Sequence, residues 1–233
     1  MSRRDEAPAS PASPAAARPS PRTRVRRLPE RARYDRATID AILDEALVAH
    51  VAYLVDGAPV VTPTLHWRDG DRLYLHGSGA GRMVRALVAG GPACIAVTLL
   101  DGLVLARSGF HHSANYRSVM VFGTATAVTD PEERRRALDR FIDARFAGRA
   151  AGLRPATATE LKATAVLWLP LDEASAKVRT GPPTDDPGDL AWPAWAGVLP
   201  LGLEAGTPER APDVDPALPV PACPTVAARE PRP

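Results

Sequence analysis

Three Asp-Gly dipeptides, each between two short apolar runs, constrain the fold of this chain more than any other feature. They stand at positions 56–57, 69–70 and 101–102. Asp-Gly between apolar runs is a strong signal for a β-hairpin, because its tight turn needs positive φ angles that Gly and Asp tolerate. Hairpins join antiparallel strands, whereas parallel strands need long crossover connections. The pattern therefore predicts an antiparallel sheet made of strands that are neighbours in the sequence.

Helical patterns are few. Apolar residues at helical spacing predict a helix over 35–47 with Thr38 as its N-cap, a short helix over 81–88, and a third helix over 131–146 that has Pro131 at its first position. The expected strands cover 50–55, 60–67, 73–76, 93–100, 103–107, 116–128, 163–169 and 174–179. The fold class is therefore mainly β with a few helices, and strands in hairpins predict a closed antiparallel barrel.

The two ends of the chain differ in composition from its middle. Residues 1–27 are rich in Pro, Ala, Ser and Arg, and residues 182–233 are rich in Pro. Such segments bury too little apolar surface to offset the entropy lost on ordering, so both are predicted to be disordered tails around a single domain at 28–181. Four apolar residues in the second tail could still dock on the domain: Trp192, Trp195, Val198 and Leu199.

Charge and hydropathy narrow the range of partners and compartments. The formal net charge is +2, which indicates no polyanionic partner, and the arginines at 22–27 are best explained as a solvated tail rather than as a nucleic-acid contact. No apolar run approaches the ~18 residues of a membrane span, and no apolar segment follows the first arginines as in a signal peptide. We therefore expect a cytoplasmic protein with neither membrane nor nucleic acid as partner.

A glycine-rich segment has the composition of an anion site. Residues 73–83 read LYLHGSGAGRM, which predicts a strand, a turn with three glycines and the start of a helix. Backbone N–H groups at a helix start favour negative charge, while Arg82 adds a cation and Ser78 a hydroxyl. The spacing imitates a dinucleotide-binding fingerprint, but the third glycine comes one residue early and the flanking Asp-Gly hairpins are antiparallel. The segment therefore favours a phosphate group.

A second segment begins with polar residues and continues as an apolar strand. Residues 115–125 read NYRSVMVFGTA, and the polar residues Tyr116, Arg117 and Ser118 at the strand start suit the mouth of a ligand site. His111-His112 stands just before it and invites a metal interpretation. Adjacent residues of a strand point in opposite directions, so the pair is poorly placed to bind one ion, and we expect no metal there.

Together the two segments resemble the split-barrel flavin-binding proteins of the pyridoxamine 5'-phosphate oxidase-like family. The likeness is to the branch of nitroimidazole-resistance and flavin-nucleotide-binding proteins, and it covers roughly Arg27 to Gly181. The motifs that carry it are Tyr116-Arg117-Ser118-Val119 with Phe122-Gly123, and Leu75-His76-Gly77 with Gly81-Arg82. The resemblance implies an FMN-binding split β-barrel that forms a homodimer with the flavin at the subunit interface.

The resemblance also assigns residues to the cofactor. Arg82, with Gly77, Ser78 and Gly81, matches the phosphate-binding turn; Thr62, Pro63 and Thr64 match the strand along the flavin ring; and His76 matches a histidine near the ring. Tyr116, Arg117 and Ser118 are expected in the same site, with His111-His112 in a loop that lines it. His76 is the one catalytic candidate, since a histidine can transfer a proton near neutral pH.

Two functions from different classes follow. The first is a flavin-dependent oxidoreductase that acts on a small molecule, and the second is a non-catalytic binder of FMN or a related phosphorylated flavin. A third possibility is a small β-barrel that binds nucleic acid through its arginine-rich tail. The sequence names no substrate, and no match was found for the C-terminal Trp and Arg of pyridoxamine-phosphate oxidases proper.

Overall fold

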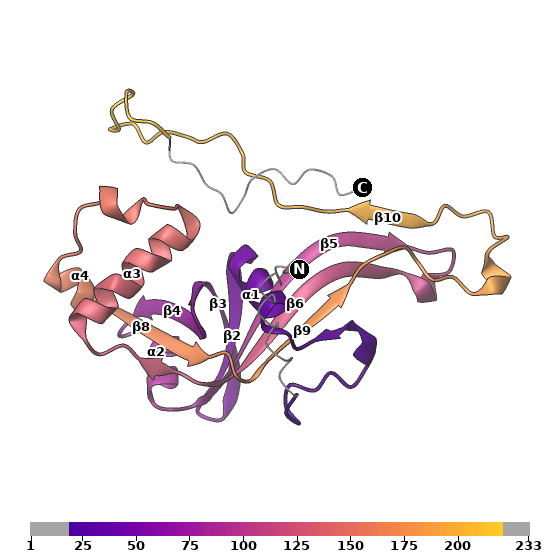
Figure 1. Cartoon of the computed structure of the whole chain (residues 1–233), viewed down its shortest axis with the longest axis horizontal. Helices are drawn as coiled ribbons and strands as arrows, with labels where there is room; N and C mark the ends of the chain where they lie inside the picture. The colour runs from indigo at the N-terminus through magenta and orange to yellow at the C-terminus, as the bar shows by residue number, and fades with distance from the viewer. Residues whose placement is uncertain (1–18, 221–233) are drawn as a thin grey trace, which may run out of the picture.

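The computed structural model describes residues 19–220, and its main feature is one large antiparallel sheet (Figure 1). Ten strands make up this sheet in the described part of the chain. They are β1 (Ala32–Arg33), β2 (Val48–Val55), β3 (Ala58–Asp69), β4 (Arg72–Ser78), β5 (Pro92–Leu105), β6 (Ser113–Thr124), β7 (Thr126–Ala127), β8 (Thr164–Pro170), β9 (Ala174–Arg179) and β10 (Gly197–Pro200).

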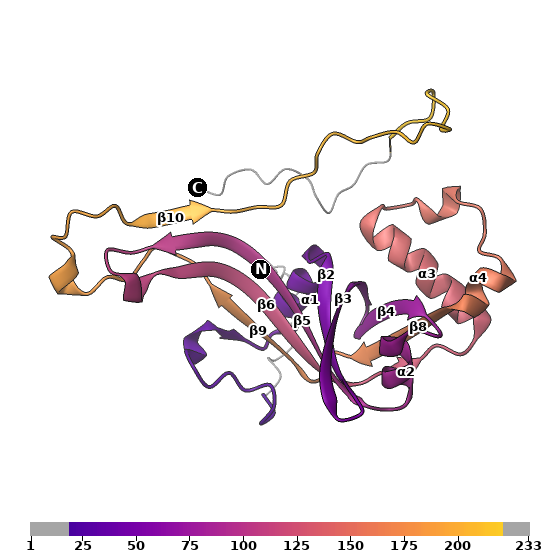
Figure 2. The ribbon, with the colours of Figure 1, turned by 180° about the vertical axis from the view of Figure 1, so that it is seen from behind.

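The strand order is β1-β9-β6-β5-β2-β3-β4-β8-β7, and β10 adds to β5. All pairings are antiparallel, as the hairpin pattern predicted. The expectation of a closed barrel is wrong for residues 19–220, because no ladder there joins the ends of this order, β1 and β7. The sheet instead curves strongly and stays open (Figure 2).

One predicted hairpin does not form. Asp101-Gly102 was expected to turn the chain, but β5 runs through it and pairs with β6 on both sides of a bulge between Leu100 and Gly102. A bulge inserts an extra residue into a strand and bends it without ending it. The two expected strands are therefore one long strand, which with β6 extends well beyond the rest of the sheet.

The helices follow the predicted positions closely. They are α1 (Arg36–Glu45), α2 (Arg82–Val88), α3 (Pro131–Arg145) and α4 (Ala158–Ala163). The side chain of Asp35, not that of Thr38, caps α1 by accepting a hydrogen bond from the Thr38 backbone N–H at 2.9 Å. Helix α4, which the sequence analysis missed, begins with a capping box in which Thr157 and Glu160 satisfy each other's backbone N–H groups. None of the described helices is long and apolar enough to cross a membrane.

Two hydrophobic clusters lie against the sheet. The larger one packs α1 and α2 on its concave side and includes Ile42, Leu43, Leu75 and Leu87. The smaller one lies under α3 and is built from Trp67, Tyr74 and Val166, with Phe141 of α3 against them. Strand alternation divides β4 between the two, because Leu75 faces the first cluster and Tyr74 the second. Helix α3 therefore covers only one part of the outer side of the sheet.

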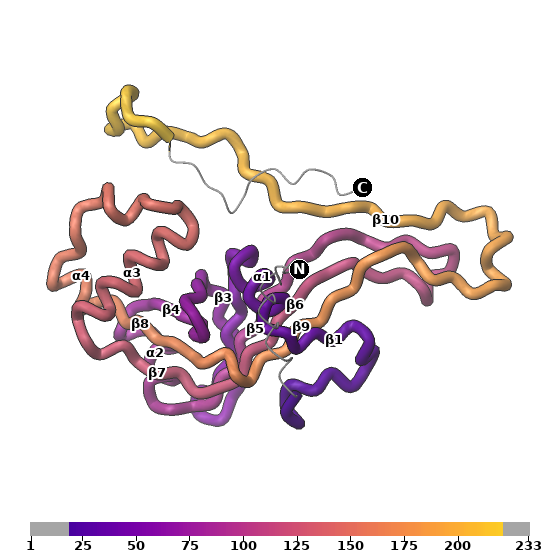
Figure 3. The backbone as a smooth tube through the Cα atoms, in the orientation of Figure 1, coloured from indigo at the N-terminus to yellow at the C-terminus, as the bar shows by residue number. Residues whose placement is uncertain are grey.

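Parts of both predicted tails belong to the folded body. Residues 1–18 and 221–233 lie outside the described range, but Thr23 is buried and the Ser20 hydroxyl donates to Glu173 at 2.6 Å. Strand β10 pairs with residues 102–105 of β5. The predicted boundaries at 28 and 181 are therefore too narrow, because docking and strand pairing depend on contacts with distant parts of the chain. After β10 the chain crosses back toward α3, and every residue of 199–220 is exposed (Figure 3).

Candidate functional site

Strand β3 changes partner at the predicted site. Its residues 58–65 pair with β2, whereas residues 66–69 pair with β4. Beyond Leu75, strand β4 continues against β8 only. No ladder therefore joins residues 58–65 of β3 to residues 76–78 of β4 in the described part of the chain. The two strands diverge, and their facing edges leave backbone polar groups available to a ligand.

The predicted residues lie on both sides of this divergence. Thr62, Pro63 and Thr64 come from the β3 side, and His76, Gly77 and Ser78 come from the last residues of β4. Two segments that are about a dozen residues apart in the sequence thus face one opening. Their joint assignment to one flavin site stays a prediction.

The glycine-rich turn has the predicted strand-turn-helix form. The Gly81 N–H donates to the Ser78 carbonyl at 2.8 Å, and Gly81 is the N-cap of α2. A Cβ atom at Gly81 would lie 2.9 Å from that same carbonyl oxygen, which is closer than real Cβ atoms approach. Only glycine fits this tight turn, and the turn is what places Arg82 at the first position of the helix.

Arg82 borders a cavity of about 430 Å³ beside the start of α2. Arg85 lines the same cavity one helical turn later, together with residues at the end of β2 such as Leu54 and Asp56. Both arginines are exposed, and no hydrogen bond or ion pair to another described residue is recorded for Arg82. Arg85 was not predicted from the sequence. It comes three residues after Arg82 on a predicted helix, and this spacing would have placed both on the same helix face. Two cations here suit an anionic group.

The His76 side chain lies on the face of β4 that is turned toward helix α3, among aromatic side chains. Its ring centroid is 4.6 Å from that of Phe141 and 6.0 Å from that of Trp67. Burial lowers the pKa of His76, so the neutral ring is favoured at neutral pH. Its Nδ1 atom is buried and has no hydrogen-bond partner among residues 19–220. A half-buried imidazole with an unused nitrogen is suited to donate to, or accept from, a bound molecule.

The two threonines of β3 point to the concave side. The hydroxyls of Thr62 and Tyr53 lie 2.9 Å apart, so one hydrogen bond of Thr62 is already satisfied. Pro63 faces the opposite side and is exposed, in register with His50 of β2. The three residues therefore contribute to the opening with their backbone as well as their side chains.

The structure does not bring Tyr116, Arg117 and Ser118 to this opening within one chain. They lie on β6, and both β5 and β2 separate β6 from β3. Three strand spacings amount to about 14 Å. The Ser118 hydroxyl is hydrogen-bonded to the Lys177 carbonyl at 3.3 Å. A contribution of these residues to the predicted site therefore requires a second copy of the chain.

Arg117 has its own partners. Its guanidinium binds the carboxylates of Glu45 at the end of α1 and of Asp101 at the β5 bulge, with 2.9 Å from Nε to Asp101 Oδ2. These carboxylates raise the pKa of Arg117, opposed by partial burial. No local pattern predicts this cluster, because its members are far apart in the chain. The role of Arg117 inside the chain is to join α1 to the long hairpin.

Comparisons with known proteins agree with this architecture. The sequence profile described as "pyridoxamine 5'-phosphate oxidase" matches residues 35–178. A search of curated proteins gave no match.

Among solved structures, the flavocytochrome Anf3 from Azotobacter vinelandii is 47% identical, with a TM-score of 0.84, and the match covers 88% of this chain and 95% of that one. The FAD and heme binding protein from Mycobacterium smegmatis is 41% identical, with a TM-score of 0.79 and coverage of 84% and 95%. A protein assigned to 5-nitroimidazole antibiotic resistance, from Bacteroides thetaiotaomicron, is 25% identical, with a TM-score of 0.54 and coverage of 63% and 86%. The profile matches more than half of the chain and includes the divergent strands and the glycine-rich turn, so the chain belongs to the pyridoxamine 5'-phosphate oxidase family.

Proposed function

We propose that this chain is a flavin-binding redox protein. The observation that carries the proposal is the glycine-rich turn after β4, which leads into α2 with Arg82 and Arg85 beside one cavity. It agrees with the similarity to the flavocytochrome Anf3 and to the FAD and heme binding protein from M. smegmatis. A flavin supplies hydride and one-electron chemistry, and the protein supplies its binding and its surroundings.

The residues present fit a flavin phosphate. Close backbone approach at Gly81 and two exposed arginines form a cradle for an anion, as the tight contact at Gly81 and the shared cavity support. Arg82 and Arg85 would hold the phosphate. The free backbone edge at Thr62 to Thr64 would hydrogen-bond the polar edge of the ring.

Both FMN and FAD carry a phosphate that this cradle could hold. We propose FAD, because two relatives above 40% identity are described by names that include FAD or a flavocytochrome. The sequence-based prediction of FMN is the alternative. The two cofactors share the ring and the first phosphate, so the arginines alone do not separate them.

An exposed apolar surface supports the expected homodimer. We call it the open face: Val48, His50, Leu54, Val61, Leu65, Leu100 and Met120. The strand registers place these residues on one side of the sheet, and the six apolar members are 42–57% exposed. Monomers rarely expose a contiguous apolar patch of this extent. Pro63 lies on the same side, so a second copy seated here would also border the proposed flavin site.

His76 is the residue that we propose next to the reacting atoms. Its neutral ring and its buried Nδ1 without a described partner allow it to donate or accept a hydrogen bond at a small substrate or at the ring. General acid or base assistance of this kind contributes about 10²- to 10⁴-fold to a rate. His76→Asn should therefore retain the flavin and lose turnover.

Heme is a second candidate cofactor, because the two similar structures are a flavocytochrome and an FAD and heme binding protein. Heme iron needs an axial donor, most often a histidine. His66 cannot serve as this axial ligand, because it is fully buried and hydrogen-bonded to the Leu43 carbonyl. The candidates for the axial ligand in the body of the sheet are therefore His50 on the open face and His76. Heme would add one-electron chemistry beside the flavin.

The experiment that tests the proposal begins with the purified full-length chain. Its visible spectrum should show flavin bands, and mass spectrometry of the released cofactor should give the mass of FAD. Release of FMN would overturn the choice of cofactor but not the flavin. A colourless protein that fails to take up either flavin in titration would overturn the proposed function. A Soret band would identify heme, and its loss in His50→Ala or in His76→Ala would assign the ligand.

A further inference from the structure

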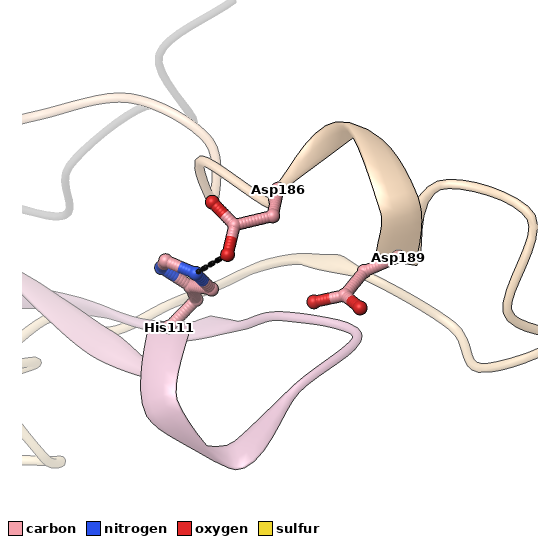
Figure 4. A group of neighbouring side chains, drawn as sticks. All are labelled: His111, Asp186 and Asp189. Atoms are coloured by element: carbon pink, nitrogen blue, oxygen red, sulfur yellow. Dashed lines mark ion pairs between the residues drawn. The ribbon is translucent and has the colours of Figure 1, made fainter.

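A group of three potential metal ligands lies at the far end of the long hairpin. His111 belongs to the short helix η2 (Gly109–His111), while Asp186 and Asp189 lie at the start and end of η4 (Pro187–Asp189). One ligand atom from each residue lies within 4.8 Å of the others. Nε2 of His111 is 3.2 Å from a carboxylate oxygen of Asp186, and Asp189 approaches the same ring from the side (Figure 4).

Neighbouring contacts hold the two segments in place without help from these side chains. Asp185 accepts hydrogen bonds from the Arg107 backbone N–H at 2.8 Å and from its guanidinium at 2.6 Å. The Asp185 side chain is only 2% exposed. On the other side, the His111 backbone N–H donates to the Ser108 carbonyl at 3.3 Å. These contacts fix the backbone at His111 and the residue next to Asp186, so the three ligands are partly preorganised.

The group formed by His111, Asp186 and Asp189 has an excess of negative charge. Asp186 and Asp189 bring two carboxylates to one imidazole, and the nearby Arg107 is already paired with Asp185. Two carboxylates at this spacing repel each other, and a cation between them removes the repulsion. The histidine decides the kind of cation, because calcium and magnesium prefer oxygen ligands only, whereas zinc accepts imidazole nitrogen together with carboxylate oxygen.

We propose that His111, Asp186 and Asp189 bind a divalent transition-metal ion, with zinc as the preferred one. Three protein ligands leave a fourth tetrahedral position for water. From the sequence, a metal at His111-His112 was not expected, because adjacent residues of a strand point in opposite directions and no carboxylate cluster stands near them in the chain. The structure brings Asp186 and Asp189 to His111 from 75 or more positions away.

A metal here would fasten the C-terminal segment to the hairpin. The ligands on η4 stand just before β10, which pairs with β5 through the four residues 197–200. A strand of this length depends on its flanking contacts to remain paired. Zinc would therefore slow the opening of β10 as well as bind at η4.

The test uses the full-length chain without a purification tag, stripped of metal with a chelator and then titrated with zinc chloride in a calorimeter. We expect one saturable site per chain. His111→Ala and Asp189→Asn should each weaken zinc binding by at least ~10-fold, since each removes one of three ligands. His112→Ala is the matched control, because it removes the adjacent imidazole, and it should bind zinc within about 2-fold of the parent.

Two further measurements test whether the metal binds at these three residues. Cobalt in place of zinc should give the visible absorption of a tetrahedral site in the parent and in His112→Ala but not in His111→Ala. Amide exchange at residues 197–199 should slow on adding zinc in the parent and not in Asp189→Asn. Absence of a saturable zinc site in the parent, or equal loss in His112→Ala and His111→Ala, would overturn the proposal.

Discussion

At the scale of single residues, Arg82 is the sharpest test of the proposed phosphate site. Arg82→Ala removes a charge-assisted contact, which costs about 1.5–3 kcal/mol, or roughly 10- to 150-fold in affinity. Binding of FMN and FAD should weaken by that factor, whereas binding of riboflavin, which lacks the phosphate, should stay nearly unchanged. Flavin fluorescence titration of the cofactor-free protein measures all three.

The control for that experiment is Arg135→Ala. This arginine lies on α3, paired with Glu132 and Asp139, and does not line the cavity beside α2. Its removal lowers the charge equally and should leave flavin binding intact. Equal weakening of riboflavin and FMN by Arg82→Ala would contradict a phosphate role and would indicate damage to the turn itself.

His66 makes stability depend on pH. Its Nε2 is hydrogen-bonded to the Leu43 carbonyl, and burial lowers its pKa from 6.5 to about 4. Between these values the unfolded chain takes up a proton that the folded chain does not. The free energy of unfolding therefore falls as the pH drops from about 6.5 to about 4, by up to about 3 kcal/mol.

Urea unfolding at pH 7 and pH 5 measures this dependence. His66→Gln can keep a hydrogen bond to Leu43 but has no titrating group, so its stability should be lower and should change less between the two pH values. His112→Gln, at an exposed position, should keep the pH dependence of the parent. A parent and a His66→Gln variant with the same pH dependence would show that another group controls it.

At the scale of elements, local signals were enough to predict α1, α2 and α3 but not the short helix α4, and they were insufficient for strand pairing. Pro131 at the helix start predicted the beginning of α3, and the structure confirms it, with Asp130 as the N-cap that was not predicted. The bulge at Gly102 was misread as a turn. Nothing near Asp101 in the sequence shows that β10, almost a hundred residues later, would pair with this stretch of β5.

Gly102 offers a direct test of that pairing. A Cβ atom there would lie 2.9 Å from the Leu199 carbonyl oxygen, so Gly102→Ala should push β10 away from β5. Amide exchange at residues 197–199 should speed up by about 10-fold or more, because a displaced strand loses its ladder hydrogen bonds. Thermal unfolding of the rest of the domain should change little.

Gly109→Ala is the matched control for Gly102→Ala. A Cβ atom at Gly109 would meet no atom within 4 Å. Amide protection of residues 197–199 should then equal that of the parent. If Gly102→Ala leaves this protection intact while the protein stays folded, β10 does not hold the position that the structure gives it.

At the scale of the whole molecule, the sequence predicted the parts of the site better than their assembly. The glycine-rich turn, Arg82 and the strand of Thr62 to Thr64 depend on local geometry and form as strand, turn and helix start, while their joint role in one flavin site stays a prediction. Tyr116, Arg117 and Ser118 were grouped with them by resemblance, yet two strands lie between. Arg117 instead joins Glu45 and Asp101, a connection that only the folded chain makes visible.

Because those residues lie apart within one chain, they can contribute to the proposed flavin site only if the chain forms a homodimer. Val61 is 57% exposed at the open face, so Val61→Glu should leave the folded chain intact. In a symmetric dimer the substitution places two carboxylates in an apolar interface, where desolvation of an unpaired charge is costly. Light scattering after size exclusion should then change from the mass of two chains to that of one.

Flavin binding should weaken together with dimerisation, because Pro63 and the opening between β3 and β4 border the open face. Leu190→Glu is the control, since this leucine is 58% exposed on the segment after η4, outside the open face. It should remain dimeric and bind flavin like the parent. A Val61→Glu monomer that binds flavin with undiminished affinity would show that one chain is enough for the site, and that Tyr116 to Ser118 have no part in it.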